Sequence, residues 1–458
     1  MPGRDAVDVL ATLLPAGRVV TDPAIIEGYR HDRARDTRVG RPRAVVRPGS
    51  TGEVQTVVRW AGRHGVPVIP RGAGTGLSGG AGAVDGCVML SLENLRAVSV
   101  DPDTRVAVAQ PGALNVEVKR AAAEYGLWYP PDPSSFETSS IGGNVATNAG
   151  GLCCVKYGVT GDYVLGLEVV LADGTAVRLG GPRIKDTAGL SLLKLFVGSE
   201  GCLGVITEVT VRLLPAPAPT STLVAAFPDL RRAADAVLAV TAGLRPSVLE
   251  LMDGTSVNAV EDKLGMGLDR SAGALLLVCS DAPGAAAAAE IEAVGQICTR
   301  HGATEVHHTD DPAEGEALAV ARRTVLPALE QRGDLLLEDV GVPLPALPAL
   351  IEGIGAIADE YDLTIALVAH AGDGNTHPMI VYDAADPDST ARAGQAFDAV
   401  MDLALSLDGT ITGEHGVGRL KRGWLPAYLG PEVLALNRRV KSALDPQGIL
   451  NPGAVFEH

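Results

Sequence analysis

The sequence is short of paired cysteines, of long apolar runs and of positive charge. Its six cysteines form no CxxC pair and no Cys/His tract with zinc-finger spacing, which argues against an iron–sulfur cluster and favours buried thiols in a reducing cytosol. No run approaches the roughly 18–20 apolar residues of a membrane span. The formal net charge of -17 disfavours a nucleic-acid partner, because such a partner needs a basic face.

The chain has 458 residues and a hydrophobic content of 46%, which is too long for one core and predicts two or three domains. The first eleven residues carry Arg4, Asp5 and Asp8 and no apolar core of signal-peptide length. A cytoplasmic location is therefore expected, with peripheral contact at the inner membrane face and a homodimer left open.

The chain opens with a strand–helix–strand pattern over residues 42–48, 51–64 and 66–70, and then meets a glycine-rich stretch over residues 70–80. Backbone N–H groups of so permissive a segment can converge on a phosphate. It is not a Walker loop, since no Gly-Lys-Ser/Thr follows. Strand patterns at 87–92, 98–100 and 106–110 follow it in place of a long helix, so it is not a Rossmann fingerprint either. A flexible loop is the alternative.

Two further stretches of small residues follow a helix expected at 115–125. Residues 138–151 are rich in hydroxyl and amide groups and can lie flat against a large planar ligand. Asp173-Gly174 predicts a hairpin between strands at 162–171 and 175–179. A short helix at 190–196 precedes the third small-residue stretch, a turn at 198–207 that leads into a strand at 205–214.

The alternating proline stretch at 215–219 reads as a stiff linker and places a domain boundary there. Beyond it, strand–helix–strand patterns recur three times and predict an antiparallel sheet with helices on one face. The three passes cover 221–227, 229–244 and 247–253, then 274–281, 285–301 and 304–309, then 335–342, 346–360 and 363–368. Helices are expected at 389–407 and 431–444, so the fold class is α+β.

Two short motifs, HAGDGNTH at 370–377 and GEHGVG at 413–418, hold three of the nine histidines. Side chains seven apart on a straight strand face opposite ways, so His370 and His377 can share an ion only if the chain turns between them. The intervening Gly and Asp residues predict that turn. With Glu414 as a third ligand, the two histidines would form a catalytic metal site with open positions.

Other residues around these motifs carry competing interpretations. His415 is expected to act as a base beside the metal. Asp373 is interpreted as a turn residue before a ligand, whereas Asn375 is either a turn residue or a substrate contact. A zinc hydrolase is a further alternative. Flavin absorbance of the purified protein would exclude it.

Taken in order, the glycine loop, the small-residue stretch and the two histidine motifs resemble the FAD-linked 2-hydroxy-acid dehydrogenases of the vanillyl-alcohol-oxidase flavoprotein group. The resemblance runs from about residue 42 to residue 452. It implies a lead-in over 1–40, a two-subdomain FAD-binding domain of the PCMH type over 41–215 and a FAD-linked oxidase C-terminal domain over 216–455. The last comprises a ferredoxin-like antiparallel-sheet cap domain, which carries substrate and metal, and a C-terminal helical segment.

The resemblance also implies the residues that hold FAD. The glycine loop would wrap the pyrophosphate, two later stretches would line the flavin and adenine, and Asn451 would return to the flavin. The loop lacks an attachment histidine, so FAD is expected to be non-covalent. The implied set is Arg71, Gly72, Ala73, Gly74, Thr75, Gly76, Leu77, Ser78, Gly79, Pro131, Asp132, Thr138, Ile141, Gly142, Gly143, Asn144, Ala146, Thr147, Gly150, Gly151, Glu200, Gly201, Gly204, Ile206 and Asn451.

The resemblance implies oxidation of a D-2-hydroxy acid to the 2-oxo acid, with a Zn²⁺-like ion on His370, His377 and Glu414. Arg322 would clamp the substrate carboxylate, although it can equally be part of a solvated helix face. Lys421 would support the same anion or lie at the surface. The electron acceptor is open between a quinone, a cytochrome, an electron-transfer flavoprotein and oxygen.

Two departures narrow the expected substrate. The 2-hydroxyglutarate branch carries a Thr where this chain has Leu326, and a Lys where it has Leu337. Without those groups a smaller or more apolar acid, such as lactate, glycolate or a longer aliphatic hydroxy acid, is favoured over 2-hydroxyglutarate. A D-2-hydroxyglutarate dehydrogenase and an electron-transfer subunit of a larger glycolate oxidase complex remain the alternatives.

Overall fold

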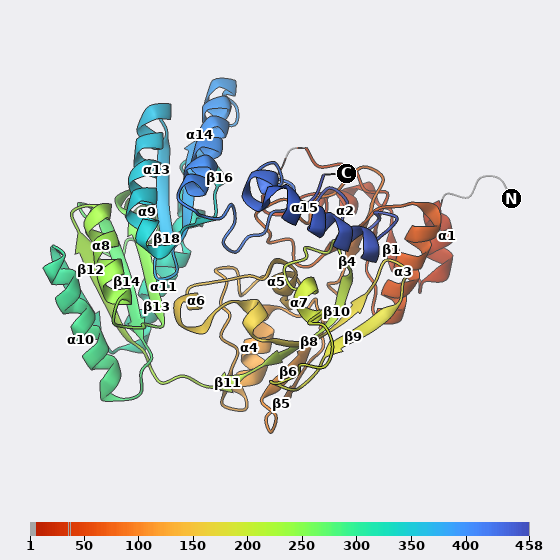
Figure 1. Ribbon diagram of the computed structural model, residues 1–458, viewed down its shortest axis with the longest axis horizontal. Coiled ribbons are helices and arrows are strands. Elements are labelled where there is room, and N and C mark those ends of the chain that lie inside the picture. Colours follow the sequence, from red (N-terminus) through yellow and green to blue (C-terminus); the bar gives the residue numbers. More distant parts are fainter. Residues whose placement is uncertain (1–5, 35, 37, 458) are drawn as a thin grey trace. The chain divides into compact units, whose positions relative to one another are not determined.

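The computed structural model describes residues 6–34, 36 and 38–457 (Figure 1). The first five residues of the expected lead-in therefore lie outside the described residues. The chain forms two compact units, and both are discontinuous in sequence. The first unit comprises the chain up to Gly150, Val159–Ala216 and Glu414–His458, and the second comprises Gly151–Gly158 and Pro217–Gly413.

The first unit contains two main sheets. In the first sheet, β2 and β3 pair with β4 in parallel, and β1 pairs with β2 antiparallel. All strand pairs of the second sheet are antiparallel. The first sheet has the order β1 (Val19–Val20), β2 (Ala44–Val46), β4 (Val88–Ser91) and β3 (Val68–Arg71). The second has the order β5 (Val98–Asp101), β6 (Val106–Ala109), β10 (Val205–Arg212), β8 (Val164–Val170) and β9 (Ala176–Gly180), and β7 (Leu127–Trp128) pairs with β11 (Leu214–Pro215).

The helices of this unit begin with a confirmed prediction. Helix α3 spans Thr51–His64: Ser50 accepts from the Glu53 backbone N–H at its start, and Gly65 ends it in the left-handed conformation. Its apolar face packs against the first sheet, in a core that includes Val57, Val88 and Leu90. The others are α1 (Ala6–Leu13), α2 (Pro23–Glu27), α4 (Asn115–Ala123), α5 (Ile141–Thr147), α7 (Leu193–Phe196) and α15 (Leu425–Leu444).

Helix α5 corrects the picture of 138–151 as a segment that lies flat against a ligand. Residues 141–147 are helical despite two glycines, because Ser140 caps the first turn by accepting from the Gly143 backbone N–H at 3.3 Å. Asn148 ends the helix in the left-handed conformation. The backbone N–H groups of Ile141 and Gly142 donate to the backbone oxygens of Ala113 at 2.8 Å and Pro111 at 2.9 Å, so the first turn is hydrogen-bonded within the protein.

The second unit is built on one antiparallel sheet. Its order is β15 (Glu305–Thr309), β12 (Ser221–Phe227), β14 (Ala274–Ser280), β13 (Val248–Asp253), β18 (Thr364–His370), β19 (Asn375–Tyr382) and β16 (Asp334–Leu337), with β17 (Val340–Gly341) also pairing with β19. The single strand expected at 335–342 is thus broken into β16 and β17, and the buried pair Glu338 and Asp339 lies at the break.

Helices cover both faces of this sheet, so the expectation of a single covered face is wrong. Every residue of β14 is buried, which requires cover on either side. One set of helices is α8 (Leu230–Thr241), α10 (Ala285–Arg300), α13 (Leu347–Tyr361) and α14 (Pro387–Ser406), with α13 beside α14 (Figure 1). The other is α9 (Gly254–Leu264), α11 (Pro312–Arg323) and α12 (Val325–Leu329), whose apolar residues share a core with Met252, Val368 and Met379. The short helix α6 (Cys154–Tyr157) completes the unit.

The sequence patterns did not indicate α9 or α12, and of α11 they indicated only a possible helix face at Arg322. Asp253 and Asp311 cap α9 and α11 by accepting backbone N–H groups of their first turns, and Pro312 begins α11. Among the described residues, no helix combines the length and the apolar content needed to cross a membrane. The expectation of buried cysteines is confirmed for five of the six, and Cys154 is half-buried.

Candidate active site

The hairpin of β18 and β19 brings His370 and His377 together. The register pairs His370 with Asn375 and Val368 with His377, so the two histidines are diagonal neighbours on one face of the sheet. Their ring centroids are 5.1 Å apart and both side chains are buried. The turn predicted between them is confirmed, and Asp373 helps to form it by accepting from the Asn375 backbone N–H at 3.1 Å.

Glu250 lies directly opposite His370 on the neighbouring strand β13. One carboxylate oxygen is 2.7 Å from His370 Nδ1, and the other is 2.8 Å from Arg322 Nε on α11. Because a carboxylate can only accept, Nδ1 carries the ring proton, and Nε2 is the ring nitrogen that could bind a metal. Sequence reasoning missed Glu250, since its strand shows only an apolar pattern.

Arg322 is not part of a solvated helix face, because only 4% of its surface is exposed. The Arg322 Nη2 atom is buried and has no hydrogen-bond partner among the described residues. The contact of Nε with Glu250 is an ion pair whose geometry falls outside that of an aligned hydrogen bond. A buried guanidinium with an unmatched donor suits a carboxylate ligand.

Asp339 fixes the end of the second unit, where the chain approaches Glu414. Its carboxylate accepts from Thr412 Oγ1 at 2.7 Å and from the Gly413 backbone N–H at 3.0 Å. A Cβ atom on Gly413 would come within 2.4 Å of the Asn375 side chain, so only glycine allows this approach. Asn375 Oδ1 is buried without a hydrogen-bond partner among the described residues, which is compatible with the expected substrate contact.

In the first unit, the C-terminal segment is bound to the glycine loop. The Arg419 guanidinium donates to the backbone oxygens of Gly79 at 2.8 Å and Gly80 at 3.0 Å. Ser78 Oγ donates to the backbone oxygen of His415 at 3.0 Å. A Cβ atom on Gly418, which has φ +53, would lie 2.0 Å from the Ser78 backbone oxygen. The loop and this segment therefore form one closely packed structure.

Glu200 and Asn451 join the third small-residue stretch to the same structure. Asn451 Nδ2 donates to the backbone oxygens of Gly80 at 2.9 Å and Glu200 at 2.7 Å. The buried Glu200 carboxylate accepts from the backbone N–H groups of Val417 at 2.8 Å and Gly418 at 2.9 Å. Burial raises the pKa of Glu200 to about 7, against the lowering effect of these two donors.

Helix α5 contacts both Glu200 and the glycine loop. The Glu200 backbone N–H donates to the Ala146 backbone oxygen at 2.8 Å. A Cβ atom on Gly72 would approach Ser140 Oγ at 2.2 Å, so the glycine loop lies against the start of α5. Asn115, which sequence reasoning missed, donates from Nδ2 to the Pro131 backbone oxygen at 3.3 Å and to Asn144 Oδ1 at 3.1 Å.

This part of the first unit fits a large polar cofactor. Ser139 Oγ and Asn115 Oδ1 are buried atoms without a hydrogen-bond partner among the described residues. Both atoms belong to residues beside those expected to hold FAD, and a buried polar atom without a partner is compatible with a contact to a polar ligand. The structure thus brings together the glycine loop, α5, Glu200 and Asn451, as the resemblance implies.

Three further expected residues, Glu414, His415 and Lys421, belong to the first unit. His415 Nε2 is 3.7 Å from Glu414 Oε1. Lys421 is only 1% exposed, so the interpretation of Lys421 as a surface residue is wrong. The role of Glu414 as the third ligand remains a prediction, as do the catalytic role of His415 and the anion-binding role of Lys421.

Two family models match the chain. The model described as "FAD binding domain" matches residues 42–180, and "FAD linked oxidases, C-terminal domain" matches residues 216–455. The fold is that of p-cresol methylhydroxylase, solved with substrate bound, with a TM-score of 0.83, 17% identity and coverage of 98% of this chain and 96% of that one. The family models and the fold thus define an FAD-binding protein with the fold of p-cresol methylhydroxylase.

Similarity to the named relatives extends over nearly the whole chain. It is 41% identical to glycolate oxidase subunit GlcD of Bacillus subtilis, covering 91% of this chain and 89% of the relative. It is 36% identical to D-lactate dehydrogenase of Archaeoglobus fulgidus, covering 90% of each chain. It is 35% identical to D-2-hydroxyglutarate dehydrogenase of Xanthomonas citri, covering 98% and 96%. The chain belongs to the FAD-linked oxidase family and is an FAD-dependent oxidoreductase.

Proposed function

We propose that this chain oxidises a D-2-hydroxy acid of the size of lactate or glycolate to the 2-oxo acid. The single observation that supports this most strongly is the pair of buried histidines on the β18–β19 hairpin, with Glu250 behind one of them. Two such imidazoles can serve as ligands of a metal ion that polarises oxygen atoms of the substrate. Relatives named for glycolate and D-lactate support the same substrate class.

His370, His377 and Glu414 would hold the divalent ion, for which two imidazoles and one carboxylate are a suitable ligand set for Zn²⁺. The inclusion of Glu414 rests on the sequence and on its position immediately after Gly413, which Asp339 anchors. When bound, the ion would polarise the substrate hydroxyl group and FAD would accept the hydride.

The remaining steps fall to side chains of this chain. His415 would take the hydroxyl proton as general base, and the 3.7 Å between its Nε2 atom and Oε1 of Glu414, the proposed third ligand, supports this role. Arg322 would bind the substrate carboxylate through its unmatched Nη2 group, and Asn375 would orient the substrate through its amide. Lys421 would add a second positive charge for the same anion.

The environment of Leu326 and Leu337 supports a small substrate over 2-hydroxyglutarate. Both side chains pack at the edge of an apolar core that includes Val325, Ala328 and Met379. A distal carboxylate placed there would lose its water without gaining a cation or a hydrogen-bond donor. The D-2-hydroxyglutarate relative leaves this acid as the competing substrate.

Steady-state kinetics on the purified protein test the proposal. Dichlorophenol-indophenol reduction should be faster with D-lactate, glycolate or 2-hydroxybutyrate than with D-2-hydroxyglutarate, and EDTA should abolish it. A clear preference for D-2-hydroxyglutarate would overturn the substrate assignment. A protein without flavin absorbance would overturn the reaction itself.

A second candidate function is that of an electron-transfer subunit in a larger complex, because the relative from Bacillus subtilis is named a subunit. In that case the electron acceptor is another protein of the complex. Dye reduction by the isolated chain would show that it carries out the chemistry alone, whereas activity only after addition of further subunits would favour the second candidate.

A further inference from the structure

Three charged or ionisable side chains of the second unit, Arg322, Glu250 and His370, form a continuous buried row. The two oxygens of Glu250 contact a different neighbour each: Arg322 Nε at 2.8 Å and His370 Nδ1 at 2.7 Å. Glu250 is 1% exposed. The three residues come from α11, β13 and β18, so no local sequence feature brings them together.

The two ends of this row have different chemical capacities. At one end, Nε2 of His370 is the ring nitrogen that can bind a metal, because Nδ1 donates to the carboxylate. At the other end, Nη2 of Arg322 is a buried donor without a hydrogen-bond partner among the described residues. A guanidinium held by one carboxylate through Nε can bind a second carboxylate through its remaining N–H groups.

Stability alone does not account for these buried charges. Replacing a buried ion pair with well-packed apolar side chains is often neutral or stabilising, and the core that includes Ala321, Met252 and Val368 is otherwise apolar. Glu250 also neutralises Arg322, whose uncompensated charge would otherwise repel a metal ion nearby. The geometry is therefore that of a support for two ligand-binding groups.

We propose that Glu250 is a positioning residue that orients His370 for the metal and Arg322 for the substrate carboxylate, and so couples the two binding events. This inference rests on the proposed function, since it requires a metal on His370 and an anionic substrate at Arg322. It adds that one carboxylate, which touches neither ligand, sets the geometry of both.

The first test compares metal retention in two Glu→Gln variants. Glu250→Gln weakens the acceptor of His370 and places an amide N–H group against a cationic neighbour. We expect a 10–100-fold loss of Zn²⁺ affinity, measured by competition with a chromophoric chelator, as is usual for an outer carboxylate behind a metal histidine. Glu261→Gln, on the surface of the same unit, is the matched control and should retain Zn²⁺ like the wild type.

A second variant separates positioning from folding. Glu250→Leu combined with Arg322→Met removes both charges and leaves no buried ion without compensation, so the protein should fold. Zn²⁺ affinity should nevertheless fall within the same 10–100-fold range, because Nδ1 of His370 has lost its acceptor. Glu250→Asp keeps the charge and should restore part of the affinity lost in Glu250→Gln.

Steady-state kinetics provide the readout for the Arg322 end. In Glu250→Gln the KM for D-lactate should rise while the KM for the dye is unchanged. Wild-type Zn²⁺ affinity in the folded double variant would overturn the inference, and so would an unchanged KM for D-lactate in Glu250→Gln. A wild-type protein that binds no divalent ion would instead overturn the metal site of the proposed function.

Discussion

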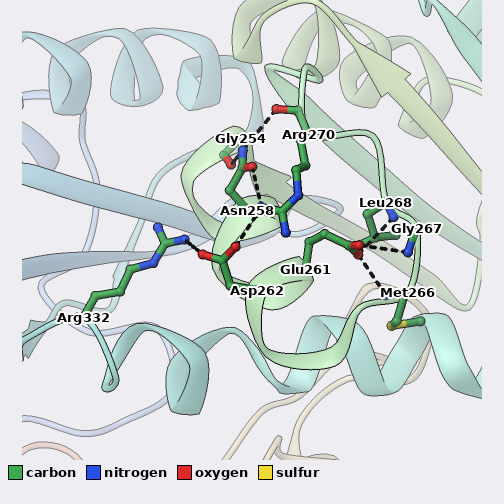
Figure 2. A network of polar contacts seen from close by, with 9 residues as sticks. All are labelled: Gly254, Asn258, Glu261, Asp262, Met266, Gly267, Leu268, Arg270 and Arg332. Carbon is green, nitrogen blue, oxygen red and sulfur yellow. Dashed lines mark hydrogen bonds and ion pairs between the residues drawn. The ribbon is translucent and has the colours of Figure 1, made fainter.

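The second unit contains two clusters of charged residues that differ in their exposure to water. On α9, Asp262 accepts from Arg270 at 2.8 Å and from Arg332 at 2.6 Å, and its side chain is 55% exposed (Figure 2). Around Glu250, the paired side chains are 1% and 5% exposed. Water and salt screen the charges of the first cluster, so substitutions there should change the stability of the protein little. The buried charges around Glu250 can instead hold their neighbours in fixed positions.

Glu261 and Glu200 both accept hydrogen bonds from backbone N–H groups, but their pKa values shift in opposite directions. Glu261, at the surface, accepts from the backbone N–H groups of Met266, Gly267 and Leu268 (Figure 2), and these hydrogen bonds, that of Leu268 first, lower its pKa. Glu200 in the first unit accepts from two backbone N–H groups, yet burial raises its pKa to about 7. Burial thus decides the sign of the shift.

The largest expected effect comes from breaking the buried pair on one side only. Arg322→Met leaves the Glu250 charge buried without compensation and should lower the free energy of unfolding by about 3–5 kcal/mol. Urea denaturation measures this. The double variant Glu250→Leu with Arg322→Met should recover most of the loss, so equal destabilisation of the single and double variants would contradict the role given to this pair.

The second effect, somewhat smaller, is a dependence of stability on pH that originates at Glu200. Its folded pKa of about 7 exceeds its ordinary value of 4.5, so between these values the folded state keeps a proton that the unfolded state has released. The contribution of this proton to the free energy of unfolding is fully present below pH 4.5. It falls by about 3 kcal/mol as the pH rises to about 7.

Urea midpoints measured across this pH range should fall less steeply in Glu200→Gln than in the wild type. Glu261 should contribute with the opposite sign, since its lowered pKa stabilises the folded state above the ordinary pKa of glutamate. Parallel pH profiles of the wild type and Glu200→Gln would refute the assignment to Glu200.

The smallest effect is expected at the exposed cluster. Asp262→Asn removes the acceptor shared by Arg270 and Arg332, but water replaces those contacts on an open surface. The urea midpoint should be indistinguishable from that of the wild type, and salt at about 1 M, where the Debye length is ~3 Å, should not change this. A marked loss of stability would remove the contrast between the two clusters.

The sequence predicted those parts of the structure that depend on residues close to one another in the chain. Helix α3 follows from its cap and its 3.6-residue apolar period, and both are local. The fold-back that joins His370 and His377 follows from the Gly and Asp residues between them. The glycine loop was likewise visible as a run of permissive residues.

The missed parts depend on residues far apart in sequence. Glu250 faces a histidine 120 residues away, and its strand neighbours give no sign of it. Arg322 was expected on a helix face, but its burial depends on contacts such as that with Glu250 on a distant strand and could not be foreseen. Arg419 and Asn115 act on backbone oxygens of distant loops, which no sequence spacing encodes.

The two units interrupt one another along the chain, which passes from one to the other after Gly150, Gly158, Ala216 and Gly413. No single cut in the gene can therefore separate them. A fragment that stops at residue 216 would lack Arg419 and Asn451, which bind the loop at Gly80. During synthesis on the ribosome, the glycine loop of the first unit therefore gains these contacts only after the C-terminal segment from Glu414 onward has been made.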